Sequence, residues 1–181
     1  MNGTYKHKRL FHRFIRLLVM IGTAISVMSI GQHVIAADFG NGMKAYRSGD
    51  YATAIEEWRP LAEADHAAAQ FNLGLMYYNG YGVPQDYAEA LTWYRRAAEA
   101  GNAEAQYNLG RIYDRGAGVP QDYIVAYMWY NLAAAQSSRS DSQIYIINRE
   151  TAIKRMTKAQ IAEGQLLSRE CLASNYKNCA Q

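Results

Sequence analysis

The chain has 181 residues, of which 50% are hydrophobic and 19% are charged, and its formal net charge is +3. Five of the 19 Lys and Arg residues precede residue 17, and no Asp or Glu comes before Asp38, so residues 38–181 carry 14 basic against 16 acidic residues, a net of −2. This balance excludes the basic footprint that a nucleic-acid-binding protein shows. Residues 38–181 are enough to form one domain with its own core.

The N-terminal segment is typical of an exported protein. Five basic residues precede an apolar stretch over 17–30, and small residues follow at Ala36 and Ala37. This layout predicts a secretory signal peptide over residues 1–37, cleaved after Ala36 or Ala37. The apolar stretch is shorter than the ~20 residues that span a bilayer, and an uncleaved anchor is the alternative. Either way, we expect the remainder to be periplasmic or secreted.

Residues 38–64 are expected to form an N-terminal helical hairpin. The turn at Gly49-Asp50 lacks the Gly-Val-Pro insert that appears later in the chain, and it looks more like the turn of a tetratricopeptide repeat.

A repeat of 36 residues organises the middle of the chain. Aligning residues 50–85 with 86–121 gives 20 identities in 36 positions without a gap, and Asp122-Tyr123 opens a third copy. A period of this length is typical of helical arrays, in which each unit buries its apolar face against its neighbours. The repeat therefore favours a binding surface over a catalytic pocket.

Each full copy contains two amphipathic helical stretches. In the second copy, apolar residues recur at helical spacing from Tyr87 to Ala98. Asp86 is placed to cap this helix, and Glu89 completes a capping-box pattern. A Gly-Asn pair separates this helix from a second one, which glycines and a proline end.

Three motifs recur with the repeat and carry a resemblance. They are Ala-x-x-x-Leu-Gly-x-x-Tyr over 69–77 and 105–113, Gly-x-Gly-Val-Pro-Gln-Asp over 80–86 and 116–122, and Trp-Tyr-x-x-Ala-Ala over 93–98 and 129–134. Together they resemble the Sel1-like repeat, a relative of the tetratricopeptide repeat, over residues 50–136. The resemblance implies an all-α, right-handed superhelical solenoid of antiparallel helix hairpins, with about eight helices here. It also implies a non-catalytic scaffold or adaptor, often in the bacterial envelope.

The flanking segments are expected to cap the array, and the repeats themselves occupy residues 65–136. Within 137–181, we expect a helix near 142–156 and a last helix over 158–174 that begins at a capping box of Thr157 and Gln160. With the hairpin of 38–64, this gives four hairpins. Terminal caps of this kind hide the exposed ends of a solenoid.

The two cysteines, Cys171 and Cys179, follow in the predicted tail. An exported protein meets an oxidising compartment, so a disulfide is expected, with two free thiols or a shared metal as the alternatives. Two sulfurs alone make a poor zinc site. No cofactor or metal is implied.

Comparing the two full copies separates packing positions from candidate binding positions on the second helix of each copy. One face is the same in both copies and consists of Gln70/Gln106, Leu73/Leu109, Gly74/Gly110 and Tyr77/Tyr113. The opposite face differs between the copies. A face that meets an identical neighbour must repeat, whereas a free face can vary, so the varying face is the candidate surface for a protein or peptide partner. Its members are Phe71, Leu75, Tyr78, Asn79, Glu104, Tyr107, Arg111, Asp114 and Arg115.

The alternatives are that these are ordinary solvated helix positions, that the same aromatic surface binds an envelope glycan, or that the chain is an enzyme acting on cell-wall or β-lactam substrates. Ser174 to Lys177 matches the Ser-x-x-Lys motif of penicillin-binding enzymes, but the Lys-Thr-Gly and Ser-Asp-Asn elements are missing. His66 aligns with Asn102 at a helix start, which favours capping over acid–base chemistry. The sequence therefore favours a non-catalytic protein.

Overall fold

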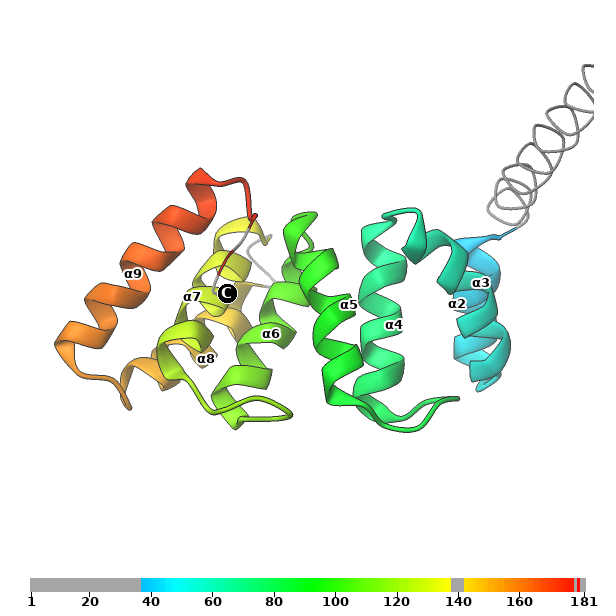
Figure 1. Ribbon diagram of the computed structural model, residues 1–181, viewed down its shortest axis with the longest axis horizontal. Coiled ribbons are helices and arrows are strands. Elements are labelled where there is room, and N and C mark those ends of the chain that lie inside the picture. The colour runs from blue at the N-terminus through cyan, green and yellow to red at the C-terminus, as the bar shows by residue number, and fades with distance from the viewer. Residues whose placement is uncertain (1–36, 138–141, 178, 180–181) are drawn as a thin grey trace, which may run out of the picture. The chain divides into compact units, whose positions relative to one another are not determined.

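The computed structural model describes residues 37–137, 142–177 and 179, and within these ranges the chain is entirely α-helical (Figure 1). The described residues from Asp38 onward form one compact unit. The predicted signal peptide lies, apart from Ala37, outside the described residues. The described residues form the helices α2 (Phe39–Ser48), α3 (Tyr51–Glu63), α4 (Ala67–Asn79), α5 (Tyr87–Glu99), α6 (Ala103–Arg115), α7 (Tyr123–Gln136), α8 (Ser142–Ile153) and α9 (Lys158–Ala173).

Consecutive helices pack on one another from α2 to α8, so each helix is covered by its neighbours in the chain. The strongest packing is within the pairs α4–α5 and α6–α7, each of which joins the second helix of one copy to the first helix of the next copy. This arrangement confirms the predicted all-α solenoid with about eight helices. The last pair differs from the other hairpins, because α8 and α9 both pack on α7 instead of forming the expected fourth hairpin.

Side-chain caps begin the helices where the sequence places them. Asp86 accepts hydrogen bonds from the backbone N–H groups of Ala88 and Glu89, and His66 accepts one at Nδ1 from Ala69. Thr157 and Gln160 form the predicted capping box at the start of α9. The box predicted at Asp86 is wrong in its second half. The Asp86 N–H already donates to the Tyr77 carbonyl, and Glu89 accepts from Trp93 Nε1 instead.

Glycine ends α4 and α6, where the linkers to α5 and α7 begin. Gly80 and Gly116 have φ values of 71° and 68°, the left-handed conformation that glycine adopts without a steric cost. Gln85 and Gln121 then donate to the backbone carbonyls of Tyr78 and Asp114, at 2.8 and 2.7 Å. The Gly-x-Gly motif is thus a structural linker in both copies.

An aromatic ring lies over a glycine at the same place in three successive hairpins. Trp58, Tyr94 and Tyr130 are buried, and each ring covers a glycine of the preceding helix: Gly42, Gly74 and Gly110, respectively. The three rings stand 36 residues apart, so the contact repeats with the array. The other tryptophans, Trp93 and Trp129, are also buried, which confirms that they belong to the core.

Candidate partner-binding face

The helices α4, α6 and α8 hold equivalent places in successive units and keep one register. In the first two units, Arg59 donates to the Tyr77 hydroxyl and Arg95 to the Tyr113 hydroxyl, each across 18 residues. In the third unit the arginine lies on the later helix: Arg149 of α8 donates to Asn131 of α7, again across 18 residues. The 36-residue offset therefore runs through α8, and we call α4, α6 and α8 the inner helices.

The face that is identical in the two copies is buried at its glutamine, leucine and glycine positions, as predicted, whereas Tyr77 and Tyr113 are half-buried. Gln70 and Gln106 donate through Nε2 to the carbonyls of Ala62 and Ala98, at 2.9 and 3.2 Å, and so tie each inner helix to the helix before it. Leu73 and Leu109 are completely buried, and their third equivalent on α8, Tyr145, is 6% exposed. This face holds the array together and is not available to a partner.

The varying face divides into two parts, which the comparison of copies did not anticipate. One part lies half-buried between successive inner helices. Tyr107 of α6 faces Tyr145 of α8 with ring centroids 4.7 Å apart, and its hydroxyl accepts from Asn148 at 3.3 Å. Asp114 pairs with Arg155 at 3.3 Å. Variation on this face therefore partly reflects which neighbour each unit packs against.

Phe71 and Tyr78 are the corresponding residues of α4. Their rings lie 6.0 and 6.4 Å from the buried ring of Tyr94, and Tyr78 also contacts Tyr87 at 5.3 Å. Both side chains are half-buried and pack against the core, so less aromatic surface is exposed here than the sequence suggests.

The other part of the varying face is open to solvent. Asn79, Glu104 and Arg115 are exposed, and Leu75 and Arg111 are half-buried. Arg111 lies between two tyrosines, with its guanidinium carbon 5.9 Å from the ring centroids of both Tyr78 and Tyr107. Such an arrangement orients the cation by the attraction of the ring faces.

Two residues of this surface were missed in the sequence. Ile144 and Ile147 of α8 are 47% and 50% exposed, among the few large hydrophobic side chains that the described residues leave open. Ile147 stands 36 residues after Arg111, which stands 36 after Leu75. Applying the repeat a third time would have identified it, but the altered turn before α8 hid the register. We call Leu75, Arg111, Arg115, Ile144 and Ile147 the inner face.

Two buried tyrosine hydroxyls lie beneath this surface. Tyr94 and Tyr130 are 0% and 1% exposed, and neither hydroxyl has a hydrogen-bond partner among the described residues. Burial raises the pKa of both hydroxyls well above the usual value, so both are neutral. They shape the floor of the surface and carry no charge.

The residues suggested for an enzyme do not assemble. The Ser174 hydroxyl donates to backbone carbonyls at the end of α9, while the Lys177 ammonium pairs with Glu99 at 3.8 Å. A serine nucleophile needs a base within hydrogen-bond reach, and the Lys177 ammonium points to Glu99 instead of Ser174.

Within the described part of the chain, no three acidic, His or Cys side chains converge as metal ligands. None of its helices is long and apolar enough to cross a bilayer.

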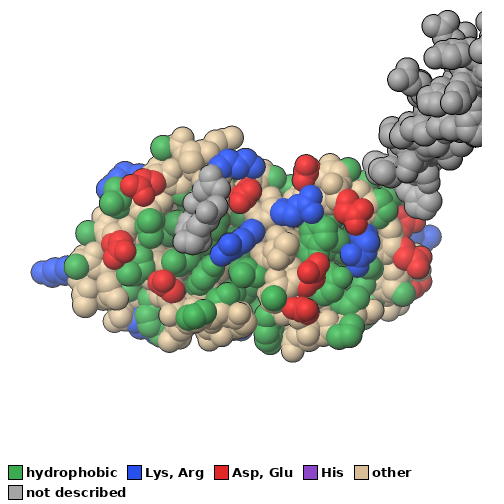
Figure 2. Space-filling view, in the orientation of Figure 1, with side chains coloured by type: hydrophobic (Ala, Val, Ile, Leu, Met, Phe, Trp, Pro, Cys, Tyr) green, Lys and Arg blue, Asp and Glu red, His purple; other side chains and the backbone are tan. Residues whose placement is uncertain are grey.

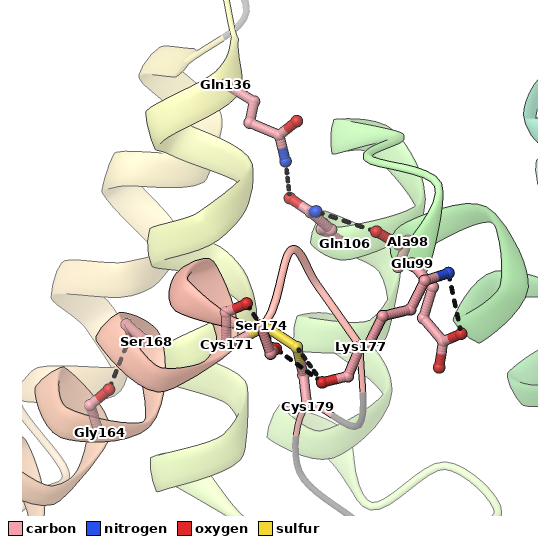
Figure 3. The surroundings of a disulfide bond; sticks show 10 residues. All are labelled: Ala98, Glu99, Gln106, Gln136, Gly164, Ser168, Cys171, Ser174, Lys177 and Cys179. Carbon is pink, nitrogen blue, oxygen red and sulfur yellow. Dashed lines mark hydrogen bonds and ion pairs between the residues drawn. A yellow bond between two sulfur atoms is a disulfide. The ribbon is translucent and has the colours of Figure 1, made fainter.

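The predicted disulfide is present and fixes the tail after α9 (Figure 3). It joins Cys171, which is 3% exposed, to Cys179. Within the loop that it closes, Tyr176 packs on the core formed by α5, α6 and α7, and Lys177 reaches Glu99 at the end of α5. The tail thus covers part of the core that α5, α6 and α7 share.

Comparison with known proteins identifies the repeat. The sequence profile of the family described as Sel1 repeat matches residues 67–102 and 103–138. No curated protein matches the chain. A Sel1 repeat protein of Oxalobacter formigenes is 36% identical over 66% of this chain and 96% of its own, with a TM-score of 0.53.

A second solved structure is a protective antigen present in uropathogenic Escherichia coli strains, described as displaying an SLR fold. It is 33% identical over 77% of this chain, with a TM-score of 0.67. The match covers 32% of the antigen, so this chain spans about a third of that longer protein.

Proposed function

Because this chain belongs to the Sel1-repeat family, whose members are in general scaffolds for protein–protein interaction, we propose that it is a non-catalytic adaptor of the bacterial cell envelope that binds a protein or peptide through its inner face. The observation that carries the proposal is the row of Leu75, Arg111 and Ile147, which three successive inner helices present. Ile147 is 50% exposed, and Leu75 and Arg111 are half-buried, so each keeps part of its side chain accessible.

The physical argument is the cost of exposing this row. Ile144 and Ile147 together expose apolar surface on one turn of α8. Exposed apolar side chains next to an oriented cation are typical of a binding surface, where burial gives affinity and charge gives specificity. Figure 2 shows one face of the molecule, on which hydrophobic side chains are interspersed with basic and acidic groups.

Export to the envelope is supported by the N-terminal signal and by the disulfide. A bond between Cys171 and Cys179 persists in an oxidising compartment. A periplasmic or secreted adaptor therefore fits the chain better than a cytoplasmic one.

Glycan binding is the second candidate, because tyrosines line the same surface. Sugar recognition uses the open faces of aromatic rings. Here Tyr78 and Tyr107 already face Arg111, and Tyr107 also faces Tyr145. The rings are therefore less available to a sugar than the isoleucines are to a peptide.

Site-specific photocrosslinking in cells tests the proposal. A photoreactive phenylalanine analogue at Leu75 or at Ile147 should form covalent adducts with a protein partner in the envelope. The matched control is Thr92, an exposed position of α5 on the opposite side of the hairpin. Adducts from both inner positions and none from Thr92 would support the proposal.

The charge of the inner face is tested in the same cells. Arg111→Glu with Arg115→Glu leaves the buried face unchanged, so the helical signal should survive while adducts at Ile147 decrease. Adducts that form only at Thr92, or that contain carbohydrate instead of protein, would contradict the proposal.

A further inference from the structure

Arg111 carries a charge that the fold orients but does not neutralise. One guanidinium nitrogen donates to Asn108 Oδ1 at 3.1 Å, and the ring contacts with Tyr78 and Tyr107 fix the plane of the group. Within the described residues no carboxylate lies within ion-pair distance of it. The acidic residue three positions later, Asp114, forms its ion pair with Arg155. A guanidinium has five N–H donors, so most of its capacity is left for a ligand.

Apolar side chains lie on both sides of this cation. Leu75 and Ile147 occupy the equivalent position of the preceding and following inner helices, 36 residues away in each direction. Ile144 extends the apolar side on α8 by one turn. Neighbouring inner helices meet through side chains, because Arg111 of α6 contacts the Tyr78 ring of α4 and Tyr107 of α6 contacts Tyr145 of α8. Helices in side-chain contact are about 8–10 Å apart. Across the three helices the surface therefore presents an apolar group, a cation and an apolar group, with a spacing of about one helix between them.

We propose that the inner face binds an extended peptide segment of a partner protein whose central residue is Asp or Glu, with an apolar residue three positions before it and another three positions after it. The carboxylate pairs with Arg111, and the apolar side chains pack on Leu75 and on the Ile144–Ile147 pair. The inference rests on the proposed function, because it specifies the chemistry of the partner at the same surface.

The spacing follows from chain geometry. In the polyproline II conformation every third side chain points the same way, and three residues advance the chain by about 9 Å. This advance matches the ~10 Å step between neighbouring inner helices. A guanidinium pairs with a carboxylate through two parallel hydrogen bonds, which also fixes the register of the peptide.

Charge and composition favour this peptide over a polyanion. The open surface holds two cations, Arg111 and Arg115, and the exposed carboxylate of Glu104 lies on the same helix. A nucleic acid or an acidic polysaccharide needs a row of cations to follow its charges. Here one oriented cation between apolar groups suits a single carboxylate with hydrophobic neighbours.

A displayed library of random 12-residue peptides, selected on the disulfide-bonded chain from Asp38 to Gln181, tests the inference. Enriched peptides are then measured by fluorescence anisotropy. We expect an Asp or Glu flanked by apolar residues at a distance of three. Changing that acid to its amide, or Arg111→Gln in the protein, should weaken binding about ten-fold, since hydrogen bonds to charged groups are the stronger class. The two changes together should weaken binding no more than either alone.

The controls separate this inference from the proposed function. Arg169→Gln removes an exposed cation of α9 and should leave binding unchanged. Peptides that lose binding with Leu75→Ser and Ile147→Ser but carry no acid would overturn the inference and leave the proposed function standing. A selection that yields no peptide sensitive to these two variants would overturn both. Displacement of the peptides by an acidic oligosaccharide or an oligonucleotide at equal concentration would overturn the inference in favour of a polyanion.

Discussion

Gly110 lies directly under the ring of Tyr130: a Cβ atom built on Gly110 would come within 2.5 Å of the Tyr130 Cδ1. The same relationship joins Gly74 and Tyr94 one repeat earlier, also at 2.5 Å. Both rings are buried, so neither can move aside without opening the core. The glycine of the Leu-Gly motif therefore exists to admit an aromatic ring of the next helix.

Gly110→Ala should destabilise the protein although alanine is the better helix former. Alanine in a helix interior normally gains up to about 1 kcal/mol over glycine. Here the methyl group overpacks the core, which costs about 1–3 kcal/mol, so a net loss is expected in urea unfolding. Arg111→Ala, at the next position, should change the free energy of unfolding much less. Equal losses for the two variants would contradict the assignment of the buried face.

Tyr130→Phe should keep or raise stability at neutral pH. The Tyr130 hydroxyl is buried without a hydrogen-bond partner among the described residues, and a buried polar group of this kind destabilises the folded state. Unfolding in urea at pH 8 measures the change. A loss of more than about 1 kcal/mol would mean that the hydroxyl is bonded in solution.

The same two tyrosines predict sensitivity to alkali. Burial raises the pKa of Tyr94 and Tyr130 above the ordinary value of 10.0. The unfolded chain releases these protons first, so the stabilisation is complete below pH 10 and is lost as the pH rises from there toward the raised values of the folded state. Each tyrosine should lower stability by about 1.4 kcal/mol per pH unit in that range. Tyr130→Phe should reduce the loss between pH 9 and pH 11, and an unchanged slope would argue against a buried hydroxyl.

Removing the disulfide should loosen the tail more than the array. A closed loop as short as that between Cys171 and Cys179 contributes about 2–3 kcal/mol by chain entropy. Cys171→Ser with Cys179→Ser should lower the melting temperature, whereas Lys177→Ala, which removes only an exposed ion pair, should lower it little. In the native protein both cysteines should resist alkylation until a reductant breaks the disulfide. Two alkylated cysteines without reductant would show that the bond does not form.

Processing of the N-terminus is tested on material purified from the envelope. Cleavage after Ala36 or Ala37 predicts a mature chain that starts at Ala37 or Asp38, which intact-mass measurement resolves. A mature form that retains Met1 would favour the uncleaved anchor.

Much of the fold could be predicted from the sequence because the same pattern of helices and linkers occurs in two full copies. Identical residues such as Leu73 and Leu109 must pack against equivalent neighbours, and local caps such as Asp86 and Thr157 act within one turn of their own helix. Periodicity and capping depend on residues close in the chain, so they survive without tertiary information. The helices and the buried face followed from them, whereas the family followed from the recurring motifs and the disulfide from the predicted export of the chain.

The composition of the inner face required the tertiary structure. The sequence showed that Tyr107 and Asp114 vary between copies, but only the position of α8 reveals that Tyr145 and Arg155 engage them. The same helix brings Ile147 into line with Leu75 and Arg111, across a turn whose sequence departs from the repeat. Whether a side chain at a varying position is free or packed depends on which helix lies next to it. That neighbour is chosen by the packing of the whole array, whereas the repeat by itself determines only the face on which the side chain lies.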